Sequence, residues 1–137
     1  MNISTEQEML DFGKKIAEEI SSGVIELVGD VGAGKTTFTR GLAEGLGIKE
    51  PVTSPSFTIS KTYSLPNGGN LVHYDFYRLP DPGIMSDDLA EKIAEPKNII
   101  VLEWSESVRN ILPKKHIKVE IKYNEDGTRE VQYENLS

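Results

Sequence analysis

The sequence contains no cysteine, a single tryptophan, only four arginines and no long apolar run. Without cysteine, the chain can form neither a disulfide framework nor a thiolate metal site. It carries 22 acidic against 15 basic residues, a formal net charge of -7, which argues against an independent nucleic-acid binder. No apolar stretch reaches membrane-spanning length, and no basic segment followed by an apolar one opens the chain. We therefore expect a cytoplasmic protein without membrane contact, folded as one domain over residues 1–137.

The central motif is a glycine-rich segment that satisfies the phosphate-binding loop pattern G-x-x-x-x-G-K-[ST]. A strand is predicted over 24–28 before it, and a helix over 35–46 after it. Strand, turn and helix in this order aim backbone N–H groups and a helix N-terminus at an anion. Lys35 can span the β- and γ-phosphates, and the Thr36 hydroxyl can bind Mg²⁺. The pattern predicts a nucleoside triphosphate site made of Gly29, Asp30, Val31, Gly32, Ala33, Gly34, Lys35, Thr36 and Thr37, and no base-reading motif chooses between ATP and GTP.

Two predicted strands carry an acid at their end, as the Walker B strand of a nucleotide-binding domain does. The strand over 70–77 carries Asp75, and the strand over 98–103 ends at Glu103. Both acids should lie at the carboxyl edge of the sheet, beside the phosphate-binding loop. Either can hold Mg²⁺ or position the attacking water, and the pattern does not rank them. His73 shares a strand face with Asp75 and is more simply interpreted as a hydrogen-bonded structural group than as a ligand.

Two other segments are candidates for nucleotide contact. The hydroxyl-rich stretch 53–58 follows the loop by one helix, where NTPases often keep a segment that senses the γ-phosphate. Its candidate switch residues are Thr53, Ser54 and Ser56. The alternative is a surface loop that leads into a strand. Trp104 directly follows the second acid; a tryptophan is normally a core residue, but beyond a sheet edge it can stack on a base or a partner.

The remaining periodicities predict an α/β fold. Ser4 is the expected N-cap of the first helix, and Ser86 that of a short later helix. The continuous apolar run over 98–103 favours a central parallel strand, and the last two strands form an antiparallel hairpin. Together these indicate a single P-loop NTPase domain with a mixed, mostly parallel sheet flanked by helices. The other predicted elements are helices over 5–21, 87–94 and 105–112, and strands over 59–64, 117–123 and 128–134.

Four segments, in this order and at these spacings, closely resemble the TsaE family, formerly called YjeE: GDVGAGKTT, TSPSF, HYDFYRL and LEWSE. The resemblance runs from about residue 4 to residue 123, and the combination is far more specific than the phosphate-binding loop alone. Members of this family are small bacterial P-loop ATPases required for making threonylcarbamoyladenosine at position 37 of tRNA. One stretch departs from the family pattern. Residues 84–97 lack the Gly and the Tyr of the family's Gly-Leu-x-x-Tyr-like segment, so the surface that partners would contact is expected to differ there.

The resemblance implies that Thr36 and Glu103 bind Mg²⁺, with Asp75 as the Walker B acid close by. It also implies that the stretch 53–57 is the nucleotide-sensing switch and that Trp104 lies near the nucleotide. The chain would bind the transferase pair TsaD and TsaB, and would use ATP binding and hydrolysis to reset that complex between rounds. It would meet tRNA only indirectly, which agrees with its acidic charge.

The residues themselves predict weak hydrolysis. Loop amides, Lys35 and Mg²⁺ can neutralise charge on the transferring phosphoryl group, but no arginine lies in an obvious finger loop, so we expect stimulation by a partner. A small P-loop kinase is one alternative, although such enzymes normally need an acceptor pocket and a longer arginine-bearing lid. The other alternative is a nucleotide-dependent scaffold. The two acids expected near the phosphates argue against it.

Overall fold

The structure is a computed structural model that describes residues 1–29, 34–52, 60–76 and 83–135. Its helices are α1 (Glu6–Glu19), α2 (Lys35–Gly45), α3 (Ile84–Ala94) and the 3-10 helix η1 (Ser105–Ile111). Its strands are β1 (Asn2–Ile3), β2 (Gly23–Val28), β3 (Ser60–Ser64), β4 (Asn70–Asp75), β5 (Ile99–Glu103), β6 (Ile117–Tyr123) and β7 (Arg129–Asn135). Within the described ranges, no helix is long and apolar enough to cross a membrane.

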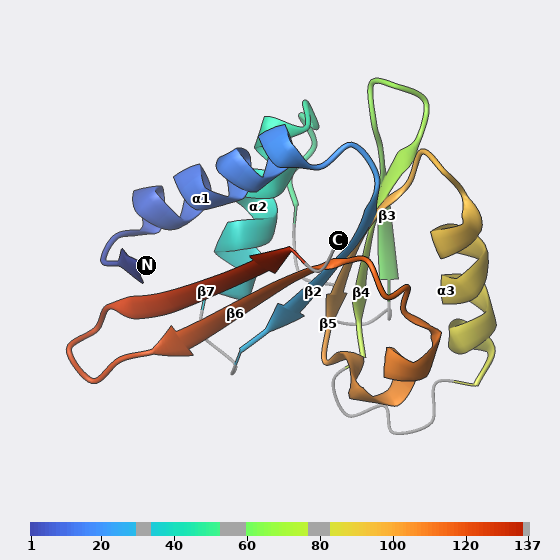
Figure 1. The fold of residues 1–137 in the computed structure, drawn as a ribbon. Helices are drawn as coiled ribbons and strands as arrows, with labels where there is room; N and C mark the ends of the chain where they lie inside the picture. Colours follow the sequence, from blue (N-terminus) through green and yellow to red (C-terminus); the bar gives the residue numbers. More distant parts are fainter. Residues whose placement is uncertain (30–33, 53–59, 77–82, 136–137) are drawn as a thin grey trace.

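The strands of the described residues join one mixed sheet in the order β1-β7-β6-β2-β5-β4-β3 (Figure 1). β6, β2, β5 and β4 run parallel and form its core. The antiparallel strands β7 and β1 extend one side, and β3 extends the other. The predicted α/β fold with a C-terminal hairpin is therefore confirmed, and parallel pairing is confined to the four central strands.

Helices cover both faces of the sheet (Figure 1). α1 and α2 pack on one face, where Phe12 and Phe38 join a core that includes Ile25 of β2. α3 and η1 pack on the other face, where a second core includes Val24 and Leu102. Successive side chains of β2 thus pack into the cores on opposite faces of the sheet, because side chains alternate along a strand. The most apolar predicted strand, β5, is buried along its whole length between β2 and β4.

α1 and α2 approach each other to backbone contact. A Cβ on Gly13 would lie 2.4 Å from the carbonyl oxygen of Phe38, and one on Gly41 would lie 2.2 Å from that of Leu10. Real side chains do not approach backbone atoms this closely, so each glycine makes room for the other helix. The contact fixes α2, and with it the helix N-terminus at Lys35, against the rest of the domain.

Two predicted helix caps are wrong. α1 is capped by Thr5, which is extended and whose hydroxyl accepts the N–H of Glu8 at 3.1 Å. The hydroxyl of Ser4 donates instead to the Glu8 carboxylate at 2.8 Å, so the capping function lies one residue later than expected. α3 begins before its predicted start, because Ser86 donates its N–H to the carbonyl of Gly83 at 3.1 Å and so belongs to the first turn.

Candidate functional site

The predicted phosphate-binding segment joins the end of β2 to the start of α2. Gly34, at the N-cap of α2, has a φ of 107°, a left-handed conformation that glycine adopts without a steric penalty. Its carbonyl accepts the N–H of Phe38 at 3.0 Å, so Lys35 is the first helical residue. The N–H groups of the first turn carry partial positive charge toward the loop. Four of the predicted ATP-binding residues lie outside the described residues: Asp30, Val31, Gly32 and Ala33.

The two predicted acids end adjacent parallel strands. Asp75 of β4 pairs with Glu103 of β5, and Glu103 pairs on its other side with Leu27 of β2. Both acids therefore lie at the carboxyl edge of the sheet, next to the strand from which the loop departs. They differ in environment, because Glu103 is 4% exposed whereas Asp75 is half-buried.

The side chain of Lys35 is folded into this edge. Its Nζ donates to the carbonyl oxygen of Gly29 at 2.7 Å and lies 3.5 Å from Oε1 of Glu103. The same ammonium lies 4.2 Å from the centroid of the Trp104 ring, within the range of a cation–π contact. Buried charges are costly unless they are paired, and these contacts compensate the burial of Lys35. The structure thus gathers four sequence-predicted residues into one cluster.

His73 is the second partner of Glu103. Its Nε2 lies 2.5 Å from Oε2 of Glu103, and its side chain is fully buried. Burial alone would raise the pKa of Glu103, but the hydrogen bond and charge of His73 and the nearby Lys35 ammonium outweigh it and lower that pKa. Glu103 is therefore ionised at neutral pH, which is the state required of a metal ligand.

The oxygen donors at this edge are of the kind that Mg²⁺ prefers. They are the carboxylates of Glu103 and Asp75, together with the hydroxyl of Thr36 in the first turn of α2. Among the described residues, no group of three His, Asp or Glu side chains is placed to hold a metal ion. Mg²⁺ in NTPase sites takes few protein ligands and completes its shell with phosphate and water. The donor set fits a Mg²⁺ ion that arrives with a nucleotide.

A cavity of about 220 Å³ opens beside the start of α2. Its lining residues are Thr5, Glu6, Met9, Gly34, Thr37 and Arg129. The sequence pattern assigns Gly34 and Thr37 to the phosphate-binding loop but does not indicate Met9 or Arg129. No motif marks these two, because only the fold brings α1 and β7 beside the loop.

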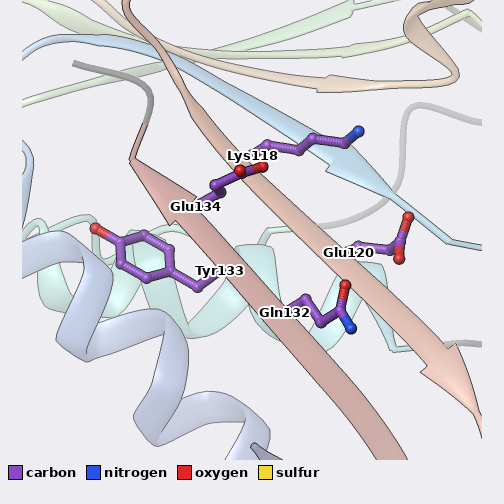
Figure 2. A pocket seen from close by; sticks show the side chains of 5 residues that line it. All are labelled: Lys118, Glu120, Gln132, Tyr133 and Glu134. Atoms are coloured by element: carbon purple, nitrogen blue, oxygen red, sulfur yellow. The ribbon is translucent and has the colours of Figure 1, made fainter.

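A larger hollow of about 310 Å³ lies on the hairpin of β6 and β7 (Figure 2). Its lining residues are Lys118, Glu120, Gln132, Tyr133 and Glu134. Two carboxylates against one ammonium disfavour a triphosphate there, and none of the predicted site residues borders it. Size alone therefore does not identify the nucleotide site.

Some predicted residues cannot be placed. The switch candidates Thr53, Ser54 and Ser56 lie outside the described residues. Their assignment stays a prediction.

Comparison with known proteins decides the family. The model of the family described as threonylcarbamoyl adenosine biosynthesis protein TsaE matches residues 3–131. The chain belongs to the TsaE family. The TsaE protein of Haemophilus influenzae is 38% identical to it over 131 residues, which cover 91% of this chain and 82% of that protein. The TsaE protein of Bacillus subtilis is 41% identical over 114 residues, covering 80% and 68% of the two chains.

A solved structure shares this TsaE-family fold. The crystal structure of YdiB from Bacillus subtilis matches the whole of this chain and 84% of its own, with a TM-score of 0.77 and 31% sequence identity. The likeness spans the mixed sheet and its helices together. The family predicted from the four sequence segments is therefore confirmed.

Proposed function

We propose that this TsaE-family chain is a weak, Mg²⁺-dependent ATPase that resets the TsaD–TsaB transferase complex between rounds of tRNA threonylcarbamoyladenosine formation. The observation that carries this proposal is the buried contact of Lys35 with Glu103, beside the glycine turn that opens α2. It brings a phosphate-binding cation, a metal-binding anion and a helix N-terminus to one edge of the sheet. The family match supports the pathway.

The proposed roles follow from the donors at this edge. The N–H groups that begin α2 and the Lys35 ammonium bind the phosphates, and Lys35 exchanges its contact with the carbonyl of Gly29 for phosphate oxygens. Thr36 and Glu103 would hold Mg²⁺, which would supply positive charge to the transferring phosphoryl group. Asp75, half-buried beside Glu103, orients the attacking water.

The cavity beside α2 offers a place for the base. It adjoins Gly34 and Thr37, so a nucleotide whose phosphates lie on the loop can extend its base into it. The Met9 thioether and the Arg129 guanidinium both border the space. A thioether and a guanidinium each contact aromatic rings favourably, and neither selects strictly between purines. Trp104 lies against Lys35 and is proposed to contact the phosphate end rather than the base.

The three arginines of the described residues support weak hydrolysis by the chain alone, and the fourth, Arg78, lies outside those residues. Arg40 is paired with Glu6, and Arg109 is paired with Glu26. Arg129 borders the proposed base cavity beside Gly34, and we assign it to the base rather than to the transferring phosphoryl group. A cation supplied by a partner to the transferring phosphoryl group accelerates related reactions about 10³–10⁵-fold. Stimulation by TsaD and TsaB is therefore part of the proposal, and contact with tRNA is through that pair.

The test is phosphate release from ATP by the purified chain, first alone and then with TsaD, TsaB and tRNA. We expect slow release alone, faster release with the pair, and repeated rounds of tRNA modification. A hydrolysis rate that is unchanged by TsaD and TsaB would reject the resetting role, although the chain would still be an ATPase. Repeated modification with Glu103→Ala would show that nucleotide binding suffices and would reject hydrolysis as the driving step.

A further inference from the structure

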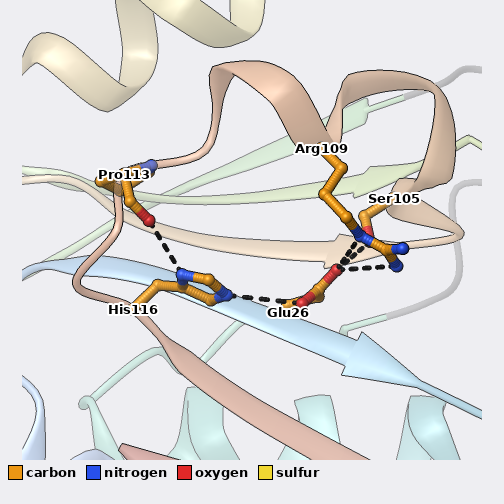
Figure 3. A network of polar contacts seen from close by, with 5 residues as sticks. All are labelled: Glu26, Ser105, Arg109, Pro113 and His116. Atoms are coloured by element: carbon orange, nitrogen blue, oxygen red, sulfur yellow. Dashed lines mark hydrogen bonds and ion pairs between the residues drawn. The ribbon is translucent and has the colours of Figure 1, made fainter. Parts of the chain in front are cut away.

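A second buried carboxylate lies outside the proposed ATP site. Glu26, in the middle of β2, is 3% exposed and is surrounded by polar partners (Figure 3). Its Oε2 accepts a hydrogen bond from the hydroxyl of Ser105 at 2.5 Å and from Nε and Nη2 of Arg109 at 3.3 and 3.2 Å. Its Oε1 lies 3.4 Å from Nε2 of His116. An ionised group at this depth is stable only because these contacts replace water.

The network ties together three segments that are separate in sequence. Glu26 belongs to the strand that leads into the phosphate-binding loop, Ser105 and Arg109 belong to η1, and His116 directly precedes β6. His116 is itself fixed, because its Nδ1 lies 2.9 Å from the carbonyl oxygen of Pro113. The polar contacts therefore anchor η1 and the chain that follows it to β2.

Ser105, which binds Glu26, directly follows a residue with an unusual backbone conformation. Trp104 has a φ of 56°, and among the described residues it alone combines a side chain with a positive φ. A bulky residue adopts this conformation only where its surroundings enforce it. The chain is held before Trp104, where Phe76 donates its N–H to the Glu103 carbonyl at 3.1 Å, and after it, where Ser105 binds Glu26.

This conformation sets where the tryptophan ring lies. The ring packs beside the second hydrophobic core and meets the ammonium of Lys35 at 4.2 Å. The bond between Ser105 and Glu26 is thus a restraint on the backbone that carries this ring.

We propose that Glu26 and Ser105 are positioning residues that hold Trp104 against Lys35 and so set the affinity of the site for nucleotide. The inference rests on the proposed ATPase function for its consequence, but the placement of Trp104 can be tested without nucleotide. Glu26 contacts neither the loop nor the proposed Mg²⁺ donors in the described residues, so its effect is transmitted through the chain from Ser105 to Trp104.

The test uses the full chain and its only tryptophan as the reporter. Ser105→Ala removes the hydroxyl and leaves Glu26 paired with Arg109 and His116, so the variant keeps most of the network. Without nucleotide, we expect Trp104 emission to shift to longer wavelength and quenching by iodide to rise. With MgATP, we expect the dissociation constant to rise roughly three- to tenfold, which corresponds to the strength of one cation–π interaction at a partly desolvated site.

Ile20→Ala is the matched control, because it removes buried apolar atoms at the far end of α1. It should lower the unfolding midpoint without changing Trp104 quenching or ATP affinity. If Ser105→Ala behaves like this control, the residue is merely structural and the inference is overturned. If Ser105→Ala does not fold, Glu26→Gln replaces it, with the same readouts deciding.

The experiments distinguish failure of the proposed ATPase function from failure of the positioning role of Glu26 and Ser105. If the wild-type chain does not bind MgATP, the proposed function is rejected, while iodide quenching still decides whether Glu26 and Ser105 hold Trp104. If the wild type binds MgATP and Ser105→Ala matches it in both quenching and affinity, only the positioning role is rejected.

Discussion

Asp75 and Glu103 are direct neighbours across β4 and β5, yet they stand in different surroundings. Glu103 is buried and shares its two oxygens between Lys35 and His73, whereas Asp75 is half-buried toward solvent. The carboxylate that the protein fixes and keeps ionised is the better candidate for a direct metal ligand. The one closer to solvent is better placed to act on water.

This difference predicts different responses to Mg²⁺. Glu103→Gln keeps the shape and removes the charge. Loss of even an outer-shell partner typically costs about 10–100-fold in metal affinity, so we expect half-maximal hydrolysis to require at least about 10-fold more Mg²⁺. Asp75→Asn should lower the rate at saturating Mg²⁺ with a smaller change in the Mg²⁺ requirement. The measurement is ATP hydrolysis against Mg²⁺ concentration for both variants. Equal shifts would contradict the assignment.

Lys35→Ala should abolish measurable hydrolysis. The Lys35 ammonium lies against Glu103 at this edge of the sheet, and removal of a group that stabilises developing charge typically costs about 10²–10³-fold in rate. Glu103 keeps His73 as a partner, so the fold should persist, and circular dichroism checks that. Lys49→Ala, an exposed lysine beyond α2, is the control and should leave the rate unchanged. Full activity of Lys35→Ala would reject the proposed site.

The sequence was enough to predict the elements whose signals are local. The glycine pattern between strand and helix places Lys35 at the start of α2, and the apolar run ending at Glu103 is the buried central strand. The alternation over 117–123 coincides with β6. These signals depend on neighbours in sequence, because side-chain alternation and turn residues act over a few positions.

The missed features depend on contacts between distant segments. Arg129 borders the cavity only because β7 lies across from the start of α2, and Glu26 looked like an ordinary residue of a buried strand. Its partners Arg109 and His116 reach it through the fold of η1 and the start of β6. The cap at Thr5 was missed by one position, since Ser4 satisfies the same residue preference.

Arg129→Gln tests the proposed base cavity. The guanidinium borders the cavity and is proposed to contact the base there, so the substitution should raise KM for ATP while leaving kcat nearly unchanged. A cation–π contact with a base corresponds to roughly a three- to tenfold rise in KM. Steady-state kinetics with ATP and with GTP measures it. An unchanged KM with a reduced kcat would place Arg129 at the phosphate end instead.

Glu26 should make stability fall at acidic pH. Burial would raise its pKa, but the hydrogen bond from Ser105 and the contacts with Arg109 and His116 outweigh burial and hold the native pKa below the ordinary 4.5. A lowered pKa contributes stability that is present above 4.5 and lost as pH falls through the native value. Glu26→Gln should therefore be less stable than wild type at neutral pH and should lose less stability on acidification.

Urea unfolding at about pH 7 and about pH 4 measures this difference. Glu44→Gln removes an exposed carboxylate on α2 and serves as the control, which should follow the wild type at both values. Parallel loss of stability in wild type and Glu26→Gln would mean that Glu26 is not the responsible group.

Gly41→Ala tests the close contact of α1 and α2, and two effects of opposite sign compete in it. Alanine favours a helix over glycine by about 0.5–1 kcal/mol. The added Cβ would lie 2.2 Å from the backbone carbonyl oxygen of Leu10, and such overpacking costs about 1–3 kcal/mol. Because backbone cannot move aside as a side chain can, we expect net destabilisation and a lower urea midpoint. Glu44→Ala, exposed on the same helix, should change stability by no more than about 0.5 kcal/mol. A stabilised Gly41→Ala would show that the helices lie further apart.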